Sequence, residues 1–200
     1  MIAIIDYDAG NLKSVEKALR FLSEDVKVTS DAQEILSADK IILPGVGAFG
    51  DAMEKLNNSG LSEVIREAVR RKIPLLGICL GQQLLFESSE ETPGVCGLSV
   101  LKGKVKKIPD KEGFKVPHIG WNSLKINPES RLFRGILDDS YVYFVHSYYL
   151  EAEEPVVAAT TDYVVDIHAA VEKDTVFACQ FHPEKSGDVG LQILKNFATL

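Results

Sequence analysis

Apolar and amphipathic segments alternate through the first half of the chain. Apolar runs at 2–5, 40–43 and 73–76 predict strands buried inside a sheet, and 26–29 is expected to form a further short strand. Two segments between them carry an apolar stripe at helical spacing: Leu61 to Val69, and Leu12 to Leu22 after Gly10-Asn11. Such alternation predicts an α/β fold, an open sheet that is mixed but mostly parallel, with helices on both faces.

The second half is richer in strand patterns. We expect strands at 100–108, 141–150, 156–161, 167–172 and 176–181, and a closing helix at about 188–198. No repeat, low-complexity tract or linker divides the chain. Its 200 residues therefore predict one domain over 1–200.

Composition and charge exclude several classes of protein. A net charge of −7 disfavours binding to nucleic acid or to an anionic membrane surface. The one short basic run, from Lys102 to Lys107, is typical of the solvated face of a strand, and the alternative is a patch that binds an anion or a partner. No apolar stretch is long enough to span a bilayer, and we expect no signal peptide because residues 1–6 lack the basic flank and the length of one. Three scattered cysteines indicate a reducing compartment, so we expect a cytoplasmic protein.

The segment Gly77-Ile78-Cys79-Leu80-Gly81 directly follows an apolar run. It has the form of a nucleophile elbow, in which a strand turns sharply into a helix, expected here at 82–87. Glycines relieve crowding around such a turn, and the helix N-terminus favours a thiolate at Cys79. The alternative is a buried structural cysteine in a glycine-containing turn.

A nucleophilic cysteine needs a basic partner. A thiol of ordinary pKa is only about 3% ionised at neutral pH, and a helix N-terminus alone does not overcome this. His182 is the best-placed histidine, because it ends a strand and is followed two residues later by Glu184. In an extended segment both side chains share one face, so the carboxylate would orient the imidazole. The alternative is a surface pair with no function.

The other histidines and thiols receive different interpretations. We expect His168 to lie on the surface, whereas His118 and His146 remain candidates for substrate or partner contacts. Cys179, within the strand before His182, is expected to be buried and inert. No CxxC motif or histidine pair at ligand spacing occurs, so the sequence predicts no metal site.

Pro44-Gly45-Val46-Gly47 also follows a strand. Glycines on either side of Val46 allow a main-chain N–H of Val46 or Gly47 to turn toward a developing oxyanion. The N–H of Leu80, directly after the nucleophile, would be the second donor. The alternative is an ordinary turn.

These three motifs together resemble the signatures of the class I (triad-type) glutamine amidotransferases, over essentially the whole chain. The segments His118-Ile119-Gly120-Trp121-Asn122 and Phe144-Val145-His146-Ser147-Tyr148 are similar to one branch of that family, the glutaminase subunits of imidazole glycerol phosphate synthases. The resemblance implies the family's fold, with no cofactor. It also implies a catalytic triad of Cys79, His182 and Glu184 that hydrolyses L-glutamine through a thioester on the cysteine.

The resemblance further implies that Gly47, Gln83, Ser147 and Tyr148 bind glutamine. Ammonia would pass to a (β/α)8-barrel cyclase subunit in a heterodimer that serves histidine biosynthesis. By the same analogy, the partner interface contains Gly10, Asn11, Trp121, Asn122, Tyr143 and Lys185. A helix N-cap for Asn11 and core packing for Trp121 are the structural alternatives. Open alternatives for the whole protein are an amidotransferase subunit serving another synthase, a cysteine peptidase of similar fold, and a non-enzymatic module.

Overall fold

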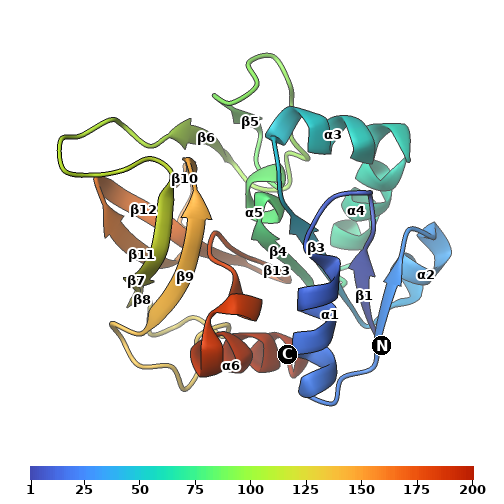
Figure 1. The fold of residues 1–200 in the computed structure, drawn as a ribbon. Helices are drawn as coiled ribbons and strands as arrows, with labels where there is room; N and C mark the ends of the chain where they lie inside the picture. The colour runs from blue at the N-terminus through green and yellow to red at the C-terminus, as the bar shows by residue number, and fades with distance from the viewer.

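The computed structural model describes residues 1–200 and is built around an eight-stranded sheet (Figure 1). The strand order across this sheet is β2-β1-β3-β4-β13-β12-β11-β8. From β2 to β13 neighbouring strands are parallel, and from β13 to β8 they are antiparallel. The prediction of a mixed, mostly parallel sheet is therefore confirmed. The strands are β1 (Ile2–Ile5), β2 (Val26–Thr29), β3 (Lys40–Gly45), β4 (Leu75–Cys79), β8 (Lys125–Ile126), β11 (Val157–Tyr163), β12 (Val165–Lys173) and β13 (Val176–Cys179).

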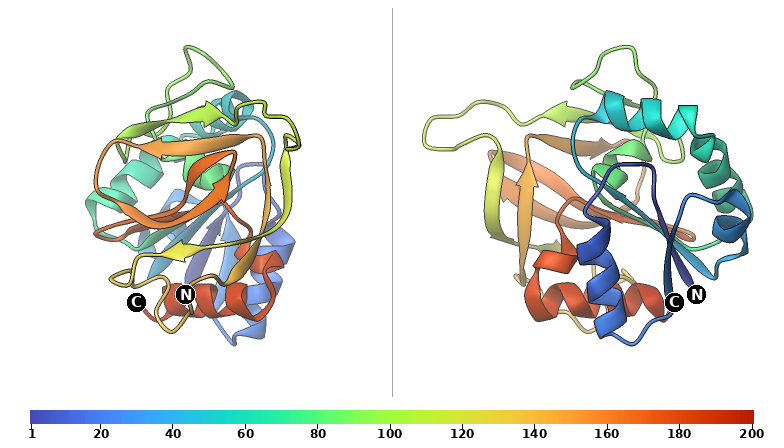
Figure 2. Two further views of the ribbon diagram at one scale, coloured as in Figure 1. Left: turned by 90° about the vertical axis from the view of Figure 1, so that its left-hand side faces the viewer. Right: turned by 45° about the vertical axis from the view of Figure 1, so that its right-hand side comes forward.

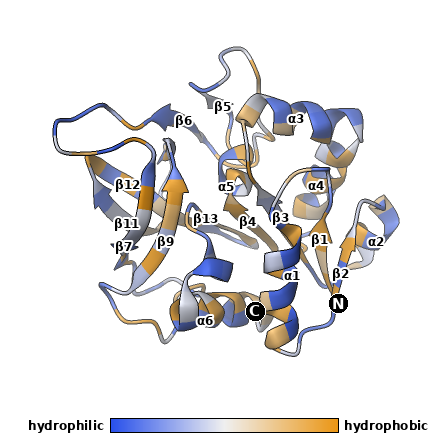
Figure 3. Cartoon of the chain, viewed as in Figure 1, coloured by the Kyte–Doolittle hydropathy of each residue, from blue (hydrophilic) through white to orange (hydrophobic).

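Helices cover both faces of the sheet, as predicted. Helices α1 (Leu12–Phe21) and α6 (Gly187–Ala198) lie on one face, and α2 (Ala32–Ser37), α3 (Phe49–Asn58) and α4 (Leu61–Arg70) on the other (Figures 1 and 2). Alternate residues of the central strands enter two separate cores; in β1, for example, Ile4 packs toward α1 and Ile5 toward the opposite helices. Figure 3 accordingly shows β1 in hydrophobic colours between the helices.

Two smaller sheets stand beside the antiparallel end of the main sheet (Figure 2). One contains β10 (Tyr148–Ala152), β6 (Gly103–Lys107) and β5 (Ser88–Ser89), and the other pairs β7 (His118–Ser123) with β9 (Tyr141–His146). The prediction of a single strand at 141–150 was wrong. The chain breaks at Ser147, because residues up to His146 pair with β7 whereas residues from Tyr148 pair with β6.

The helix after the elbow is also shorter than expected. Helix α5 (Leu80–Leu84) ends before residue 87 because a later segment takes the carbonyl groups that would extend it. The N–H of Leu98 donates to the Leu84 oxygen at 2.8 Å, and the N–H of Val100 to the Leu85 oxygen at 2.9 Å. The strand before the elbow begins at Leu75 rather than at 73, since Ile73 still donates to Ala68 at the end of α4.

The carboxyl ends of β3, β4 and β13 meet at one edge of the sheet. Ligands and catalytic groups of open α/β sheets gather at such an edge. The motifs at residues 44–47, 77–81 and 180–184 are therefore brought together by the strand order. None of the helices combines the length and the apolar character that crossing a bilayer requires.

Candidate active site

The turn from β4 into α5 holds Cys79 in an unusual backbone conformation. Its φ of 57° and ψ of −113° lie outside the regions that residues with a side chain normally adopt. A Cβ on Gly77 would come within 2.8 Å of the Gly81 oxygen, and one on Gly81 would collide with the carbonyl oxygen of Leu43. The expected elbow is present, but its glycines make room for the backbones of α5 and β3 rather than for the Cys79 side chain.

His182 and Glu184 form a buried pair at the end of β13. The Nδ1 atom of His182 lies 2.9 Å from Oε1 of Glu184, and their side chains are only 3% and 0% exposed. The expected pairing is present and His182 itself is extended, but the extended segment predicted to continue through Glu184 was wrong: Pro183–Lys185 is a 3₁₀ turn, η1, which brings the Glu184 carboxylate back to the imidazole. The Ser186 hydroxyl, which sequence reasoning missed, donates to the His182 oxygen and accepts from the N–H of Tyr143.

The electrostatics of His182 favour its charged form. Burial opposes the imidazolium, but the interactions with the Cys79 sulfur and with the Glu184 carboxylate outweigh it and raise the pKa of His182 to about 9. Both residues line the same pocket, although they are about a hundred residues apart in sequence. Because Glu184 occupies Nδ1, Nε2 is the ring atom left for chemistry.

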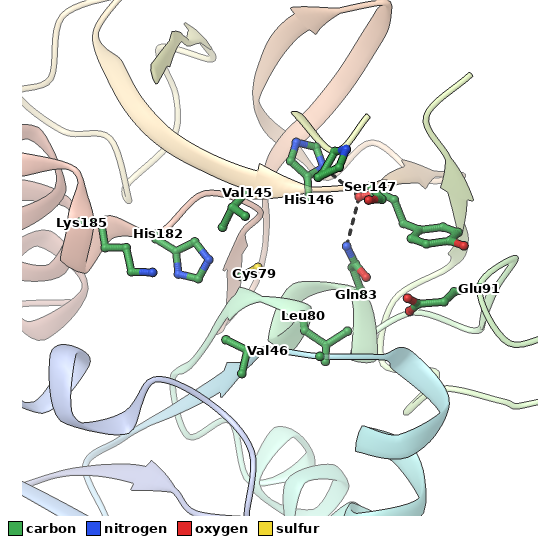
Figure 4. Close-up of a pocket in the computed structure, with 13 residues that line it drawn as sticks. Val46, Cys79, Leu80, Gln83, Glu91, Val145, His146, Ser147, His182 and Lys185 are labelled. Atoms are coloured by element: carbon green, nitrogen blue, oxygen red, sulfur yellow. Dashed lines mark hydrogen bonds between the residues drawn. The ribbon is translucent and has the colours of Figure 1, made fainter. Parts of the chain in front are cut away.

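A pocket of about 420 Å³ opens over Cys79 (Figure 4). In Figure 4, His182 lies on one side of the sulfur and Gln83 on the other, while Val46 and Leu80 lie below it. Most of the site residues expected from the sequence line this pocket: Val46, Gly47, Cys79, Leu80, Gln83, Ser147, Tyr148, His182 and Lys185. His146 lines it as well.

Glu91 is a pocket residue that sequence reasoning missed. It lies in the turn after β5, and its carboxylate faces the pocket on the side away from His182 (Figure 4). Its Oε2 accepts from the main-chain N–H of Phe49 at 2.8 Å, at the first turn of α3. No motif marks this position, because the turn reaches the pocket only through the packing of α5 and α3.

The segment 44–47 leaves donors available beside the sulfur. The N–H groups of Val46 and Gly47 donate to no acceptor within the protein, and Gly47 has a φ of 95°. Tyr7, also missed at the sequence level, anchors this segment, since its buried hydroxyl donates to the Pro44 oxygen at 2.9 Å. Burial, together with the nearby Cys79, raises the pKa of the Tyr7 phenol, so the hydroxyl keeps its proton.

Two glutamine side chains lie beside Cys79: Gln83 lines the pocket, and Gln180 contacts the sulfur. Gln83 donates through Nε2 to the Tyr148 oxygen at 3.2 Å and to Oε1 of Gln180 at 2.8 Å. Gln180, which is fully buried, places its own Nε2 3.7 Å from the Cys79 sulfur. Sequence reasoning assigned no role to Gln180, although it lies in the same motif as His182.

An exposed apolar face adjoins the pocket. Trp121 of β7 lies opposite Tyr143 of β9, with ring centroids 6.0 Å apart. Trp121 is 54% exposed, so the alternative that it packs in the core was wrong. The same strands expose Ile119 and Tyr141. We call these four side chains the β7–β9 face.

The remaining interface candidates lie in different settings. Gly10 approaches Pro44, and Lys185 lines the pocket. Asn11 stands at the N-cap of α1 without a side-chain capping bond. The Asn122 amide is used inside the chain, because it donates to the Asp162 oxygen at 3.0 Å.

The predictions for Cys179, for His168 and for the basic run can also be compared with the structure. Cys179 is buried, as expected, and burial raises the pKa of its thiol. His168 was expected on the surface but is only partly exposed, and its Nδ1 accepts from the N–H of Ala152 at 3.0 Å. Lys106 pairs with Glu151 on a half-solvated strand, in agreement with the interpretation of the basic run. No three His, Cys, Asp or Glu side chains gather in an arrangement that could hold a metal ion.

Comparisons with known proteins add independent information. A family model described as "Glutamine amidotransferase class-I" matches residues 3–199. The imidazole glycerol phosphate synthase subunit HisH of Caldanaerobacter subterraneus is 52% identical over 100% of this chain and 98% of its own length. The HisH subunit of Methanocaldococcus jannaschii is 52% identical over the whole of both chains. A solved glutamine amidotransferase superposes with a TM-score of 0.77 over the whole of both chains at 20% identity, which supports the fold alone.

Proposed function

The chain belongs to the class-I glutamine amidotransferases, and we propose that it is the glutaminase subunit of an imidazole glycerol phosphate synthase. In this role it hydrolyses the side-chain amide of glutamine and supplies ammonia for histidine biosynthesis. The observation that carries the chemistry is the placement of Cys79 and His182 in one pocket, with a His182 pKa of about 9.

The proposed reaction begins with the thiolate of Cys79. The sulfur attacks the amide carbon of glutamine, and the N–H groups of Leu80 and of Val46 or Gly47 stabilise the resulting oxyanion. The protonated His182 gives its Nε2 proton to the departing nitrogen, so ammonia leaves and a thioester remains.

Neutral His182 then activates a water molecule. The water attacks the thioester carbon, the C–S bond breaks, and the electron pair returns to sulfur as glutamate forms. Glu184 keeps the imidazole in the orientation that both steps need, since it holds Nδ1 at 2.9 Å.

Glutamine would lie between the sulfur and the far wall of the pocket. We assign its amino-acid end to Gln83, Gly47 and the main chain at Ser147 and Tyr148, all of which line the cavity. Glu91 lies on that same wall, and its carboxylate suits the α-ammonium group of the substrate. A Glu91→Gln variant is expected to raise KM for glutamine more than it lowers kcat.

The proposed partner is a (β/α)8-barrel cyclase that forms a heterodimer with this chain. HisH relatives are subunits of a synthase, so a partner subunit belongs to the assembly. The β7–β9 face supports this docking site, because exposed aromatic residues beside a catalytic pocket are typical of interface hot spots. Gly10, Asn11, Asn122 and Lys185 complete the proposed interface. Ammonia would then pass directly into the cyclase instead of into solvent.

We treat residues 1–200 as one catalytic domain, which the family match over residues 3–199 supports. The three cysteines are free thiols, two of them buried. Free thiols persist in reducing compartments, so we place the enzyme in the cytoplasm.

A glutamine-mimicking diazoketone tests the proposed chemistry directly. Incubation with the complex, followed by mass spectrometry, should find the label on Cys79 and on neither Cys96 nor Cys179. Excess glutamine should protect Cys79. An unlabelled Cys79 in a complex that consumes glutamine would overturn the assignment.

A further inference from the structure

We propose that Gln180 is a hydrogen-bond donor to the Cys79 sulfur and that it stabilises the thiolate of this nucleophile. Its Nε2 lies 3.7 Å from Sγ, and its side chain is fully buried. No other protein acceptor receives a bond from this amide nitrogen. The proposal rests on the proposed function only in calling Cys79 the nucleophile.

The orientation of the Gln180 amide follows from a main-chain group. The Tyr148 oxygen can only accept, so the side chain that contacts it at 3.2 Å, Gln83, must present its NH₂ group. The same NH₂ group lies 2.8 Å from Gln180, which must therefore present its oxygen there. The NH₂ group of Gln180 is consequently the end that faces the sulfur.

Two histidines in series support the Tyr148 carbonyl: His146 contacts its oxygen, and His118 contacts His146. Nδ1 of His146 lies 2.8 Å from the Tyr148 oxygen, and its Nε2 lies 2.9 Å from Nδ1 of His118. Burial lowers the pKa of His146 to about 3 and that of His118 to about 4, so both rings are neutral at pH 7. With one proton each, His118 donates to His146 and His146 donates to the Tyr148 carbonyl.

All the donors in this chain of contacts thus have assigned directions. Figure 4 shows the Gln83 amide bonded toward the main chain of β10, on the opposite side of Cys79 from His182. The sulfur therefore faces an oriented amide N–H of Gln180 in addition to the His182 imidazolium. A hydrogen bond to a charged acceptor is stronger than one to a neutral acceptor, so Gln180 favours the thiolate over the thiol.

The same contact matters twice in the proposed reaction. The electron pair lies on sulfur before the attack on glutamine and returns there when the thioester breaks down. In both states the Gln180 N–H faces the charged sulfur, whereas the neutral thioester gains less from it.

The test measures the reactivity of the thiol, so that it does not depend on glutamine binding or on a partner. In a Cys96→Ser background, which removes the exposed thiol, the rate of Cys79 alkylation by iodoacetamide is followed against pH. Gln180→Met should move the midpoint of this profile upward by about one pH unit, which is about a tenfold slower alkylation at pH values below both midpoints. The substitution removes none of the other ionisable groups around the sulfur and the pocket, which are Tyr7, Glu91, Cys179, His182, Glu184 and Lys185.

Gln82→Met is the matched control. Gln82 is a neighbouring, fully buried glutamine of α5, but its amide donates to the His168 oxygen and not to the sulfur. Its alkylation profile should coincide with that of the parent. A Gln180→Met profile that coincides with the control would overturn the proposal, even if glutaminase activity falls, because Gln180 would then act only through Gln83.

Gln180→Glu serves if the methionine variant does not fold. Glutamate keeps the shape and the oxygen that accepts from Gln83, but an ionised carboxylate replaces the N–H donor with a like charge. The midpoint should then move upward relative to the parent protein. An unmoved midpoint would contradict the proposal, whereas failure of the diazoketone to label Cys79 would count against the proposed function alone.

Discussion

The Nδ1 atom of His182 and the Oε1 atom of Glu184 lie 2.9 Å apart within a single 3₁₀ turn. Both side chains are almost fully buried. Placed at the end of β13, this pair faces the cysteine that ends β4, because β13 and β4 are neighbours in the sheet. The orientation of the imidazole therefore depends on one turn, and its position depends on strand order.

Glu184→Gln should disturb the orientation of the His182 imidazole without affecting the binding of glutamine. Glutamine keeps the size of the side chain but removes the negative charge that supports the imidazolium. We expect kcat for glutamine hydrolysis in the complex to fall by about 10²- to 10⁴-fold. KM should change little, since Glu184 does not line the pocket. Synthesis from added ammonia is the control and should keep its rate; an unchanged kcat would show that the carboxylate is dispensable.

The His182 environment makes stability depend on pH. The pKa of His182 is raised from 6.5 to about 9, so the folded state holds this proton more tightly than the unfolded state does. The stabilisation is fully present below pH 6.5 and is lost as the pH rises through about 9. Guanidinium unfolding between pH 6 and 10 measures it, with His182→Gln as the reference. The difference in unfolding free energy between the two proteins should shrink over this window, and parallel curves would refute the shift.

Two glycines of the site should respond differently to alanine. Gly81→Ala places a Cβ against the Leu43 carbonyl, which no side-chain rotation relieves, and should lower the free energy of unfolding by about 3 kcal/mol. Gly47→Ala meets no neighbour and should cost only about 1 to 2 kcal/mol of backbone strain. Its larger effect should be on kcat, because the Val46–Gly47 segment supplies a proposed oxyanion donor. Urea unfolding and steady-state assays distinguish the two variants; equal losses of stability would be the opposite result.

Trp121 should dominate binding to the partner. Trp121→Ala removes a half-exposed aromatic side chain of the β7–β9 face and should weaken the complex about 30-fold by calorimetry. Diazoketone labelling at saturating partner should be retained. Phe21→Ala is the matched control, because Phe21 is even more exposed but lies at the far end of α1 from Asn11. Equal effects of the two substitutions would place the partner elsewhere.

Much of the fold was predictable because its signals are local. The apolar run and glycines around Cys79 specify a strand, a turn and a helix within ten residues, and the amphipathic stripe at 61–69 specifies α4. Errors arose where pairing partners lie far apart in sequence. The break at Ser147 depends on β7 and β6, and the early end of α5 depends on residues 97–101.

The sequence by itself determined which residues to propose as nucleophile and basic partner, since a glycine-flanked cysteine after a buried strand and a histidine followed by Glu184 are recognisable within a few residues. Only the tertiary structure decided which groups surround the sulfur. Gln180, Glu91 and the Tyr148 carbonyl come from separate elements. The direction in which an amide donates depends on its neighbours in space, and these are set by strand order and side-chain packing rather than by spacing along the chain.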